Sequence, residues 1–298
     1  IAHRVRLVTT YIFGRDLIDS IDVGQLKEML SAGIVPVVAG FQGIDEDSGA
    51  VTTLGRGGSD TTAVALAAAL DSCPCYIFTD VDGVYSALPS WCPKAKKLNT
   101  LTYDEMLELA SGGAKVLHTR SVSLARRYKV PLWVALSFEE VEGTLVAEEY
   151  EGMENAVVTG ITCKTDESRL TIRNLPDVPG TAAKVFDAIA QSGAVVDMIV
   201  QSQGLEGRAQ ISFTVPHGEV PAVKRALDGL TGNVLKGAAL DVESGIAKIT
   251  IVGEGMRNHS GIASQMFKIL ADRGINIDMI STSEIKITVA NDAAAARP

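Results

Sequence analysis

A twenty-residue segment occurs twice in this chain, and the repeat constrains the architecture of the whole second half. Residues 180–199 align without gaps on residues 261–280. The two copies share both glycines, two alanines, a phenylalanine and the run Asp-Met-Ile. A repeat of this length is one supersecondary unit, so the second half is predicted to contain the same small fold twice.

Segments rich in β-forming residues flank each copy of the repeat. They cover 169–173 and 210–215 around the first copy, and 248–252 and 284–289 around the second. A further helix is predicted over 219–229. The order strand, helix, strand, strand, helix, strand is that of a ferredoxin-like sandwich. In the second copy residues 291–298 stand where the last helix is expected, so we expect a truncated second domain.

The first half alternates predicted strands and helices. The strands are expected over 33–40, 76–79 and 130–134, and the helices over 61–70, 103–110 and 114–128. Glycines bound the apolar run 33–40, a pattern typical of a strand buried on both faces. Thr102 is a predicted N-cap, with Asp104 and Glu105 in the first turn of the helix that follows it. This alternation predicts an α/β domain with a largely parallel sheet.

An acid-rich stretch separates the two halves. Residues 139–155 contain the runs Glu-Glu-Val-Glu and Glu-Glu-Tyr-Glu, which are typical of a solvated linker. We therefore expect three domains, over 1–148, 156–236 and 237–298, within the 298 residues.

Charge and cysteine content exclude several classes of function. Lys and Arg total 27 against 36 Asp and Glu, a net charge of −9, which argues against nucleic acid or an anionic membrane as the main partner. No apolar run reaches the ~18 residues of a membrane span. The cysteines form no CxxC pair and no cluster with histidine, so neither a metal site nor a disulfide framework is predicted, and a reducing compartment is expected. They are Cys73, Cys75, Cys92 and Cys163.

A glycine-rich stretch over 52–62 is the strongest signal of chemistry. Its glycines at 55, 57 and 58 allow backbone amides to approach a ligand closely. Ser59, Asp60 and Thr61 then open a helix whose N-terminus favours an anion. Arg56 can form a charge-assisted pair with a carboxylate or phosphate. No Gly-Lys-Ser/Thr follows, so the stretch is not a Walker A loop. The alternative is a tight turn with an N-cap.

Several segments in order resemble the aspartate kinases, a branch of the amino-acid kinase family. They are 39–43, 52–62, 79–85, 103–110 and 113–118 in the first half, while 175–180 and 281–287 are similar to the family's paired regulatory ACT domains. The resemblance implies an α/β, parallel-sheet amino-acid kinase (carbamate kinase-like) domain, partial, followed by two ferredoxin-like ACT domains. The family's Lys-Phe-Gly-Gly-Thr-Ser loop does not occur in the sequence. We expect that loop upstream, and the first half to be the C-terminal part of the kinase domain.

The resemblance implies transfer of the γ-phosphoryl group of ATP, with Mg²⁺, to the side-chain carboxylate of L-aspartate. The product is 4-phospho-L-aspartate, formed in the first step of lysine, threonine and methionine biosynthesis. A carboxylate nucleophile with a pKa near ~4 is already ionised at pH 7, so no general base is required. Catalysis then requires that the reacting groups be positioned and the phosphate charge neutralised, and Arg, Lys, Mg²⁺ and backbone amides are suited to this.

The resemblance also implies roles for individual residues. The catalytic roles fall on Arg56 and Asp60, and aspartate would be held by Arg56, Gly57, Gly58 and Ser59. The nucleotide would be contacted by Thr79, Asp80, Tyr85 and Lys115. Leu88 and Ser90 stand where the family's nucleotide loop has an acid and a base.

The ACT pair implies feedback control by lysine or threonine, between which the sequence does not choose. The effector residues would be Asp177, Gly180, Thr181, Ala182, Gln201, Asn276, Ile277 and Asp278. We expect a homo-oligomer, a dimer or larger, formed through the ACT domains. The expected location is the cytoplasm, or a plastid if the source is a photosynthetic eukaryote.

Two other readings stay open. One is a noncatalytic amino-acid-sensing module beside a degenerate kinase remnant, which Leu88, Ser90 and the absent loop favour. The other is a different amino-acid kinase such as a glutamate kinase, against which the duplicated ACT region argues.

Overall fold

The computed structural model describes residues 5–12, 15–148, 157–204, 207–233, 235 and 237–296. They form two compact units. Unit 1 contains Ile1–Thr162 and Val252–Gly255, and unit 2 contains Cys163–Ile251 and Met256–Pro298. Part of the predicted acidic linker, residues 149–156, lies outside the described residues. Within the described part of the chain, no helix is long and apolar enough to cross a membrane.

Unit 1 begins with a four-stranded sheet of order β2-β1-β3-β4. Its strands and its helix are β1 (Arg6–Ile12), β2 (Arg15–Asp22), α1 (Gly24–Ser31), β3 (Gln42–Asp45) and β4 (Val51–Thr53). β1 pairs with β2 in antiparallel fashion and with β3 in parallel. β4 leads directly into the glycine-rich stretch.

The second sheet of unit 1 has the order β5-β9-β10-β8. Its strands are β5 (Cys75–Thr79), β8 (Thr100–Thr102), β9 (Leu132–Leu136) and β10 (Thr144–Ala147), and β6 (Val84–Tyr85) pairs separately with β7 (Lys97–Leu98). The pairs β5–β9 and β8–β10 are parallel, as predicted, whereas β9–β10 is antiparallel, so the sheet is mixed.

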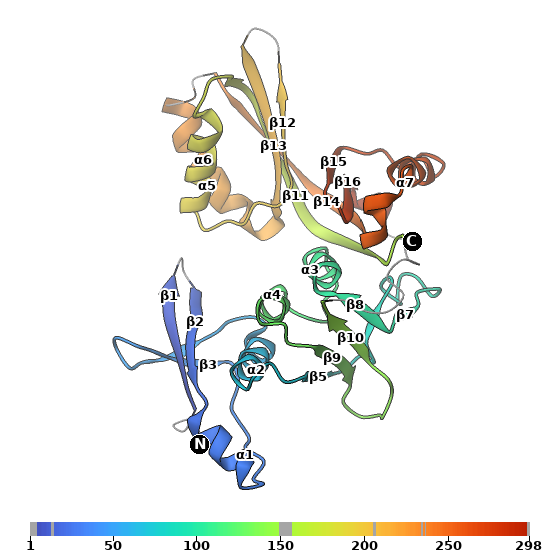
Figure 1. Cartoon of the computed structure of the whole chain (residues 1–298). Coiled ribbons are helices and arrows are strands. Elements are labelled where there is room, and N and C mark those ends of the chain that lie inside the picture. Colours follow the sequence, from blue (N-terminus) through green and yellow to red (C-terminus); the bar gives the residue numbers. More distant parts are fainter. Residues whose placement is uncertain are drawn as a thin grey trace. The chain divides into compact units, whose positions relative to one another are not determined.

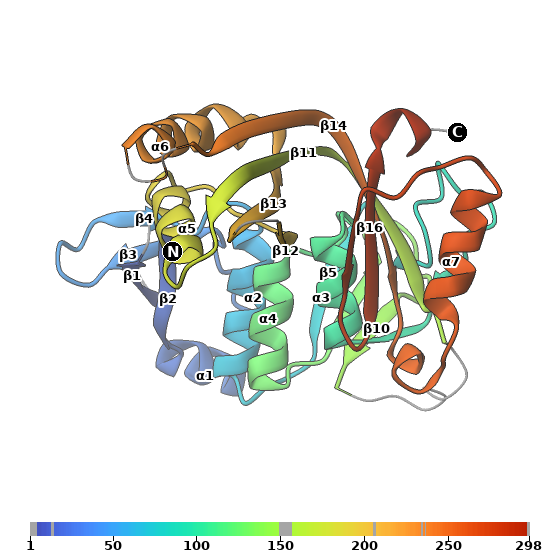
Figure 2. The same cartoon turned by 90° about the horizontal axis from the view of Figure 1, so that it is seen from above.

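Three helices cover one face of this second sheet (Figures 1 and 2). They are α2 (Gly58–Ala69), α3 (Tyr103–Ser111) and α4 (Thr119–Tyr128). Fully buried side chains from helices and strands meet in one core, among them Val64, Met106, Val122, Leu132 and Val134. Burial of such side chains is the main favourable term in folding.

The predicted capping of α3 is confirmed. The Thr102 side chain accepts a hydrogen bond from the Glu105 backbone N–H, and the Glu105 carboxylate accepts one from the Thr102 N–H. This reciprocal capping box satisfies two backbone donors at the helix start.

Two predicted elements differ from the structure. Residues 33–40 form no strand, and Val35 and Val37 are 84% and 79% exposed. A strand requires a hydrogen-bonding neighbour, and none of the described strands pairs with this segment. The helix predicted over 114–128 begins only at Thr119, because the His118 side chain accepts the Arg120 N–H and caps the helix there.

Unit 2 contains one six-stranded sheet of order β12-β13-β11-β14-β16-β15. Its strands are β11 (Gly160–Pro176, whose first three residues lie in unit 1), β12 (Ile199–Gln203), β13 (Arg208–Pro216), β14 (Ala239–Val252), β15 (Met279–Thr282) and β16 (Lys286–Asp292). Its helices are α5 (Thr181–Gln191), α6 (Val220–Asn233) and α7 (Ile262–Ala271). In the place that α6 has in the first repeat, the second repeat has a short 3₁₀ turn over Ala293–Ala296.

The two long strands β11 and β14 each serve both repeats. Ion pairs join Arg169 to Glu243 and Arg173 to Asp241, linking β11 to the first half of β14. The second half of β14 pairs with β16, where the Thr250 and Thr288 hydroxyls lie 2.9 Å apart. Each repeat therefore completes its four-stranded sheet with a strand that also belongs to the other repeat.

The repeated Asp-Met-Ile run has a structural reason. Met198 and Met279, the methionines of the two copies, lie in the same small buried cluster with Ile246 and Ala290. Asp197 of the first copy pairs with the buried Lys248, whose Nζ also lies 3.1 Å from a carboxylate oxygen of Glu167. Asp278 of the second copy instead accepts a hydrogen bond from the Asn276 side chain.

Phe213 is the largest fully buried side chain of the first repeat and packs edge-on against Phe186. We expect Phe213→Ala to lower the free energy of unfolding by about 3–5 kcal/mol, because it removes apolar burial and leaves a cavity. Phe138→Ala, at a side chain that is 88% exposed, should change it by less than about 0.5 kcal/mol. Urea unfolding followed by circular dichroism measures both, and equal effects would contradict the assigned core.

Candidate active site

The glycine-rich stretch forms a left-handed turn that ends as the cap of α2. Gly55 and Gly57 have φ angles of 72° and 69°, a region that favours glycine. The Thr61 hydroxyl donates to the Gly57 carbonyl and the Thr62 hydroxyl to the Gly58 carbonyl. α2 thus begins at Gly58, three residues before its predicted start, and its first amides lie at the end of the loop.

The start of α4 lies directly against this loop. A Cβ on Gly57 would overlap the His118 side chain, so only glycine fits at that position. The Arg120 guanidinium donates to the Leu54 and Asp16 carbonyls, both at 2.7 Å. These contacts fix the loop that precedes Gly57.

Phe41 supports the loop from the other side. Its φ of 72° is rare for an aromatic residue. The Phe41 N–H donates to the Thr62 hydroxyl, and its carbonyl accepts from the Leu54 N–H. A Cβ on Gly58 would lie 2.8 Å from the Phe41 ring. Backbone strain at Phe41 is thus held by α2 and the loop together.

The predicted aspartate-binding residues share this turn. Arg56 and Ser59 are exposed, Gly58 is buried and Asp60 is half-buried. Partial burial raises the pKa of Asp60 above its ordinary value, while the charge and the backbone N–H of His118 act in the opposite direction. The turn therefore combines an exposed guanidinium, a hydroxyl and a helix N-terminus, which together suit an anion.

The predicted nucleotide residues lie at and after the carboxyl end of β5. The Thr79 hydroxyl donates to the Asp80 carboxylate at 3.0 Å, and the Thr79 carbonyl accepts from both the N–H and the hydroxyl of Ser137. The Tyr85 hydroxyl donates to Asp82, whose carboxylate also lies 3.4 Å from the Lys97 Nζ. Loss of hydration and the Asp82 carboxylate raise the pKa of Tyr85.

Lys115 lies in an exposed turn between α3 and α4 and not, as predicted, within a helix. His118, three residues after Lys115, packs against Gly57, so the end of this turn lies beside the glycine-rich stretch. Among the described residues, no hydrogen bond or ion pair joins Thr79 or Tyr85 to Arg56. The described contacts therefore connect the Lys115 turn, and not the β5 end, to the glycine loop.

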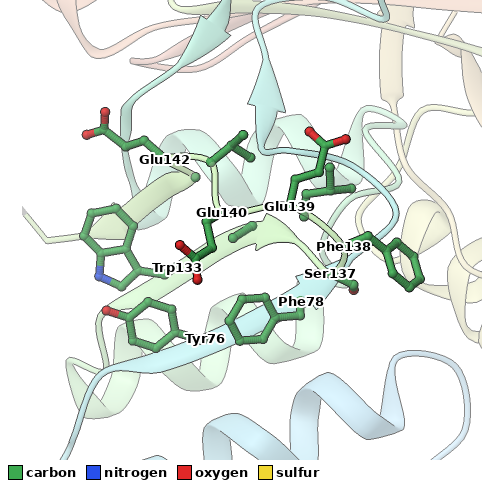
Figure 3. Close-up of a pocket in the computed structure, with 12 residues that line it drawn as sticks. Tyr76, Phe78, Trp133, Ser137, Phe138, Glu139, Glu140 and Glu142 are labelled. Carbon is green, nitrogen blue, oxygen red and sulfur yellow. The ribbon is translucent and has the colours of Figure 1, made fainter.

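A separate aromatic hollow of about 440 Å³ lies on the second sheet (Figure 3). Tyr76 stacks on Phe78 and on Trp133, and Glu139, Glu140 and Glu142 lie at its rim. None of the predicted site residues lines it. Its apolar floor and acidic rim do not suit a phosphate group.

In unit 2 the first repeat contains a second cavity, of about 330 Å³. Five predicted effector residues line it together: Asp177, Gly180, Thr181, Ala182 and Gln201. Gly180 caps α5 with a φ of 93°, matched by 92° at Gly261 in the second repeat. The other three predicted effector residues, Asn276, Ile277 and Asp278, do not line this cavity.

Sequence reasoning assigned no role to His118 or Arg120. His118 takes the N-cap position of α4, where Asn, Asp, Ser or Thr is usual, so no capping signal in the sequence marks it. Arg120 gives no signal either, since its partners at residues 16 and 54 are far away in the sequence.

Gly55 and Gly57 form a matched pair for testing the loop. Both have left-handed backbones, but no atom lies within 4 Å of a Cβ on Gly55, whereas His118 occupies that place beside Gly57. Gly55→Ala should cost about 1–2 kcal/mol of stability through backbone strain alone. Gly57→Ala should cost more, because His118 must also move. Urea unfolding of both variants gives the comparison, and equal costs would contradict the described contact.

The raised pKa of Asp60 gives a pH-dependent prediction. Because the folded state holds this proton more tightly than the unfolded chain, Asp60 stabilises below its ordinary pKa of 3.8 and loses that contribution as the pH rises through the raised value. The free energy of unfolding of Asp60→Asn, relative to that of the parent, should therefore increase as the pH rises from 3.8 through the raised pKa. Asp45→Asn is the control of opposite sign, because hydrogen bonds from Ser48 lower the pKa of Asp45. Unfolding from about pH 3 to 7 reports both slopes, and slopes of the same sign would contradict the assignment.

Comparisons with known proteins match both halves of the chain. The model of the amino acid kinase family matches residues 3–135, and an ACT domain model matches 173–229 and 249–297. The aspartate kinase Ask_LysC of Stutzerimonas stutzeri is 47% identical over 288 residues, covering 96% of this chain and 69% of that protein. The aspartokinase of Pseudomonas aeruginosa is also 47% identical, over 96% of this chain and 70% of the relative.

The solved structures that are similar to this chain are aspartokinases as well. Escherichia coli aspartokinase III in complex with aspartate and ADP superposes with a TM-score of 0.81 at 28% identity, and its complex with lysine and aspartate with a TM-score of 0.75 at 29% identity. In each case 97% of this chain covers 65% of the other. The chain thus spans about two thirds of the length of the proteins it matches. The fold class inferred from the sequence is confirmed, and the chain belongs to the aspartate kinase family, with an amino acid kinase region followed by ACT domains.

Proposed function

We propose that the protein transfers the γ-phosphoryl group of ATP to the side-chain carboxylate of L-aspartate. The bond between the γ-phosphorus and the β,γ-bridging oxygen breaks, a carboxylate oxygen of aspartate bonds to phosphorus, and ADP leaves. The observation that carries this proposal is the turn over 55–60, which presents Arg56, Ser59 and the start of α2 to an anion in a chain of this family.

The residues of this turn supply positioning and charge. Arg56 pairs with a carboxylate of aspartate, and Ser59 and the amides after Gly57 and Gly58 donate hydrogen bonds to it. Asp60 orients the reacting groups from the first turn of α2. No general base is required, since the nucleophile is itself a carboxylate.

Thr79, Asp80, Tyr85 and Lys115 are the proposed nucleotide contacts. Their support is the placement of Thr79 at the carboxyl end of a parallel strand, where α/β proteins bind ligands, and the ADP in the related Escherichia coli structure. Leu88 is 56% exposed and Ser90 is exposed. Neither side chain is charged, so the positive charge that neutralises the nucleotide phosphates must come from other groups.

Mg²⁺ is the proposed companion of ATP. In the described part of the chain no group of three or more His, Cys, Asp or Glu side chains could hold a metal ion by itself. Asp80 and Asp82, beside the nucleotide residues, fit the usual mode of Mg²⁺, which binds through one or two carboxylates together with substrate phosphates. The ion would neutralise charge on those phosphates.

We further propose feedback control through the ACT repeats, by lysine or threonine bound at the cavity that Asp177 and Gln201 line. The lysine in one Escherichia coli complex supports such control. Asn276, Ile277 and Asp278 would take part from the second repeat. A homo-oligomer through the ACT domains, the division at 1–148, 156–236 and 237–298, and a cytoplasmic location remain our proposals. The four unpaired cysteines are compatible with that location.

The activity is tested with ATP, Mg²⁺ and L-aspartate on the protein expressed from its complete reading frame, with hydroxylamine to trap the acyl phosphate. Aspartyl hydroxamate is the expected product. Its absence, together with binding of lysine or threonine in calorimetry, would favour the noncatalytic sensing module instead.

Arg56 gives the matching variant test. Arg56→Ala should lower kcat/KM for aspartate by at least about 30-fold, because a carboxylate then loses its charged partner. Arg127→Ala is the control, since that arginine lies at the far end of α4 beside the Tyr128 ring. If both variants keep the parent kcat/KM, Arg56 does not bind the substrate.

A further inference from the structure

The chain passes between the two units three times. It leaves unit 1 after Thr162, returns for the four residues 252–255, and enters unit 2 again at Met256. The segments 157–162 and 252–255 therefore belong to unit 1 and are covalently continuous with unit 2. Any displacement of unit 2 must act on these two segments.

One buried carboxylate holds both segments to the start of α3. Glu105 is 1% exposed. Its Oε1 accepts hydrogen bonds from the Thr159 hydroxyl at 2.5 Å and from the Glu254 N–H at 3.3 Å, while its Oε2 accepts from the Thr102 N–H at 3.1 Å. The Thr102 hydroxyl in turn donates to the Glu254 carboxylate. Three segments distant in sequence thus meet at a single side chain.

The two segments also lie unusually close to their neighbours in unit 1. A Cβ on Gly253 would come within 2.9 Å of the Thr159 nitrogen, and one on Gly160 within 2.8 Å of the Leu109 side chain. At the other end of α3, a Cβ on Gly112 would overlap the Thr162 side chain. Such close contacts leave little room for the segments to move without α3.

The same segments also contact residues that lie close in sequence to the predicted nucleotide residues. The Ile161 N–H donates to the Ser86 carbonyl at 2.7 Å, one residue after Tyr85. Gly112, which Thr162 contacts, lies three residues before Lys115. A shift of 157–162 would therefore reach both Tyr85 and Lys115.

We propose that Glu105 is a positioning residue that couples ligand binding in the ACT repeats to the predicted nucleotide site. It does so by holding segments 157–162 and 252–255 to α3, so that a movement of unit 2 reaches Tyr85 and Ser86 at the end of β6 and the Lys115 turn. This inference rests on the proposed function, since it explains how one site regulates the other. Glu105 itself touches neither ligand.

Two variants remove different parts of this network. Thr159→Val keeps the shape of the side chain but removes the hydroxyl donor to Glu105. Glu105→Gln places an amide N–H₂ opposite the Thr102 N–H. Asp104→Asn is the matched control, because Asp104 is the neighbouring residue in the first turn of α3 and pairs on the surface with Arg126.

The first readout is inhibition of aspartyl hydroxamate formation by lysine and by threonine. In both test variants the half-inhibitory concentration of the active effector should rise roughly 3- to 30-fold. Its calorimetric Kd without nucleotide should change by less than about twofold, because the effector cavity is untouched. Asp104→Asn should leave both unchanged. An inhibition curve identical to the parent's in both test variants would overturn the proposal.

The second readout does not depend on catalysis. Hydrogen exchange of the 298-residue chain is compared with and without saturating lysine or threonine. The ligand that binds should change exchange at Ile161, Glu254 and along α3 in the parent, and less so in Thr159→Val. No change there in the parent, or no binding of either amino acid, would refute the coupling. A parent that forms no hydroxamate but shows this exchange response would refute the proposed activity alone. If Glu105→Gln does not fold, Thr159→Val alone tests the proposed coupling.

Discussion

The pairing of β11 with β14 holds the two ACT repeats in one sheet and brings together the two chain segments that connect unit 2 to unit 1. Each strand completes the sheet of both repeats, and ion pairs from Arg169 and Arg173 keep them in register. Because the two strands pair in this register, the beginning of β11 and the end of β14 lie together, where the Thr159 N–H donates to the Val252 carbonyl. The pairing thereby delivers two chain segments to the same place at the start of α3. Without it, neither repeat would have four strands and Glu105 would lack two of its three partners.

The candidate site depends on a different kind of restraint, the close contact of backbone with side chains. Gly57 takes a left-handed conformation against His118, and Phe41 is held in a strained one by Thr62 and Leu54. These contacts fix the amides at the start of α2, so that the donors proposed to bind an anion are already oriented. Such preorganisation is what phosphoryl transfer to a carboxylate demands, since the nucleophile needs no base and the barrier lies in charge and position.

Much of the fold was predictable because local signals agreed with tertiary structure. The capping box at Thr102 and Glu105, the strand at 76–79 and the repeated units follow from patterns within short windows. Two predictions were wrong for different reasons. The apolar run 33–40 has no paired neighbour among the described strands, which depends on the folded chain. The helix predicted from residue 114 begins only at Thr119, because His118 caps it locally with a residue that is not a usual N-cap. At the candidate site the turn from Arg56 to Asp60 was predictable from its glycines. Arg120 was not, because its partners are two backbone carbonyls far away in sequence.

The family, the duplication of the ACT unit and the residue types of the turn over 55–60 can be read from the amino-acid sequence, because each depends on residues that are contiguous or nearly so. Folding adds what no short segment contains: β11 and β14 are shared between the repeats, five predicted effector residues line one cavity, and the Glu105 carboxylate binds groups from three segments. The two kinds of information differ because the underlying interactions have different ranges along the chain. Backbone propensity and capping act within a few residues, whereas strand pairing and the burial of a carboxylate depend on groups that meet only when the chain is folded.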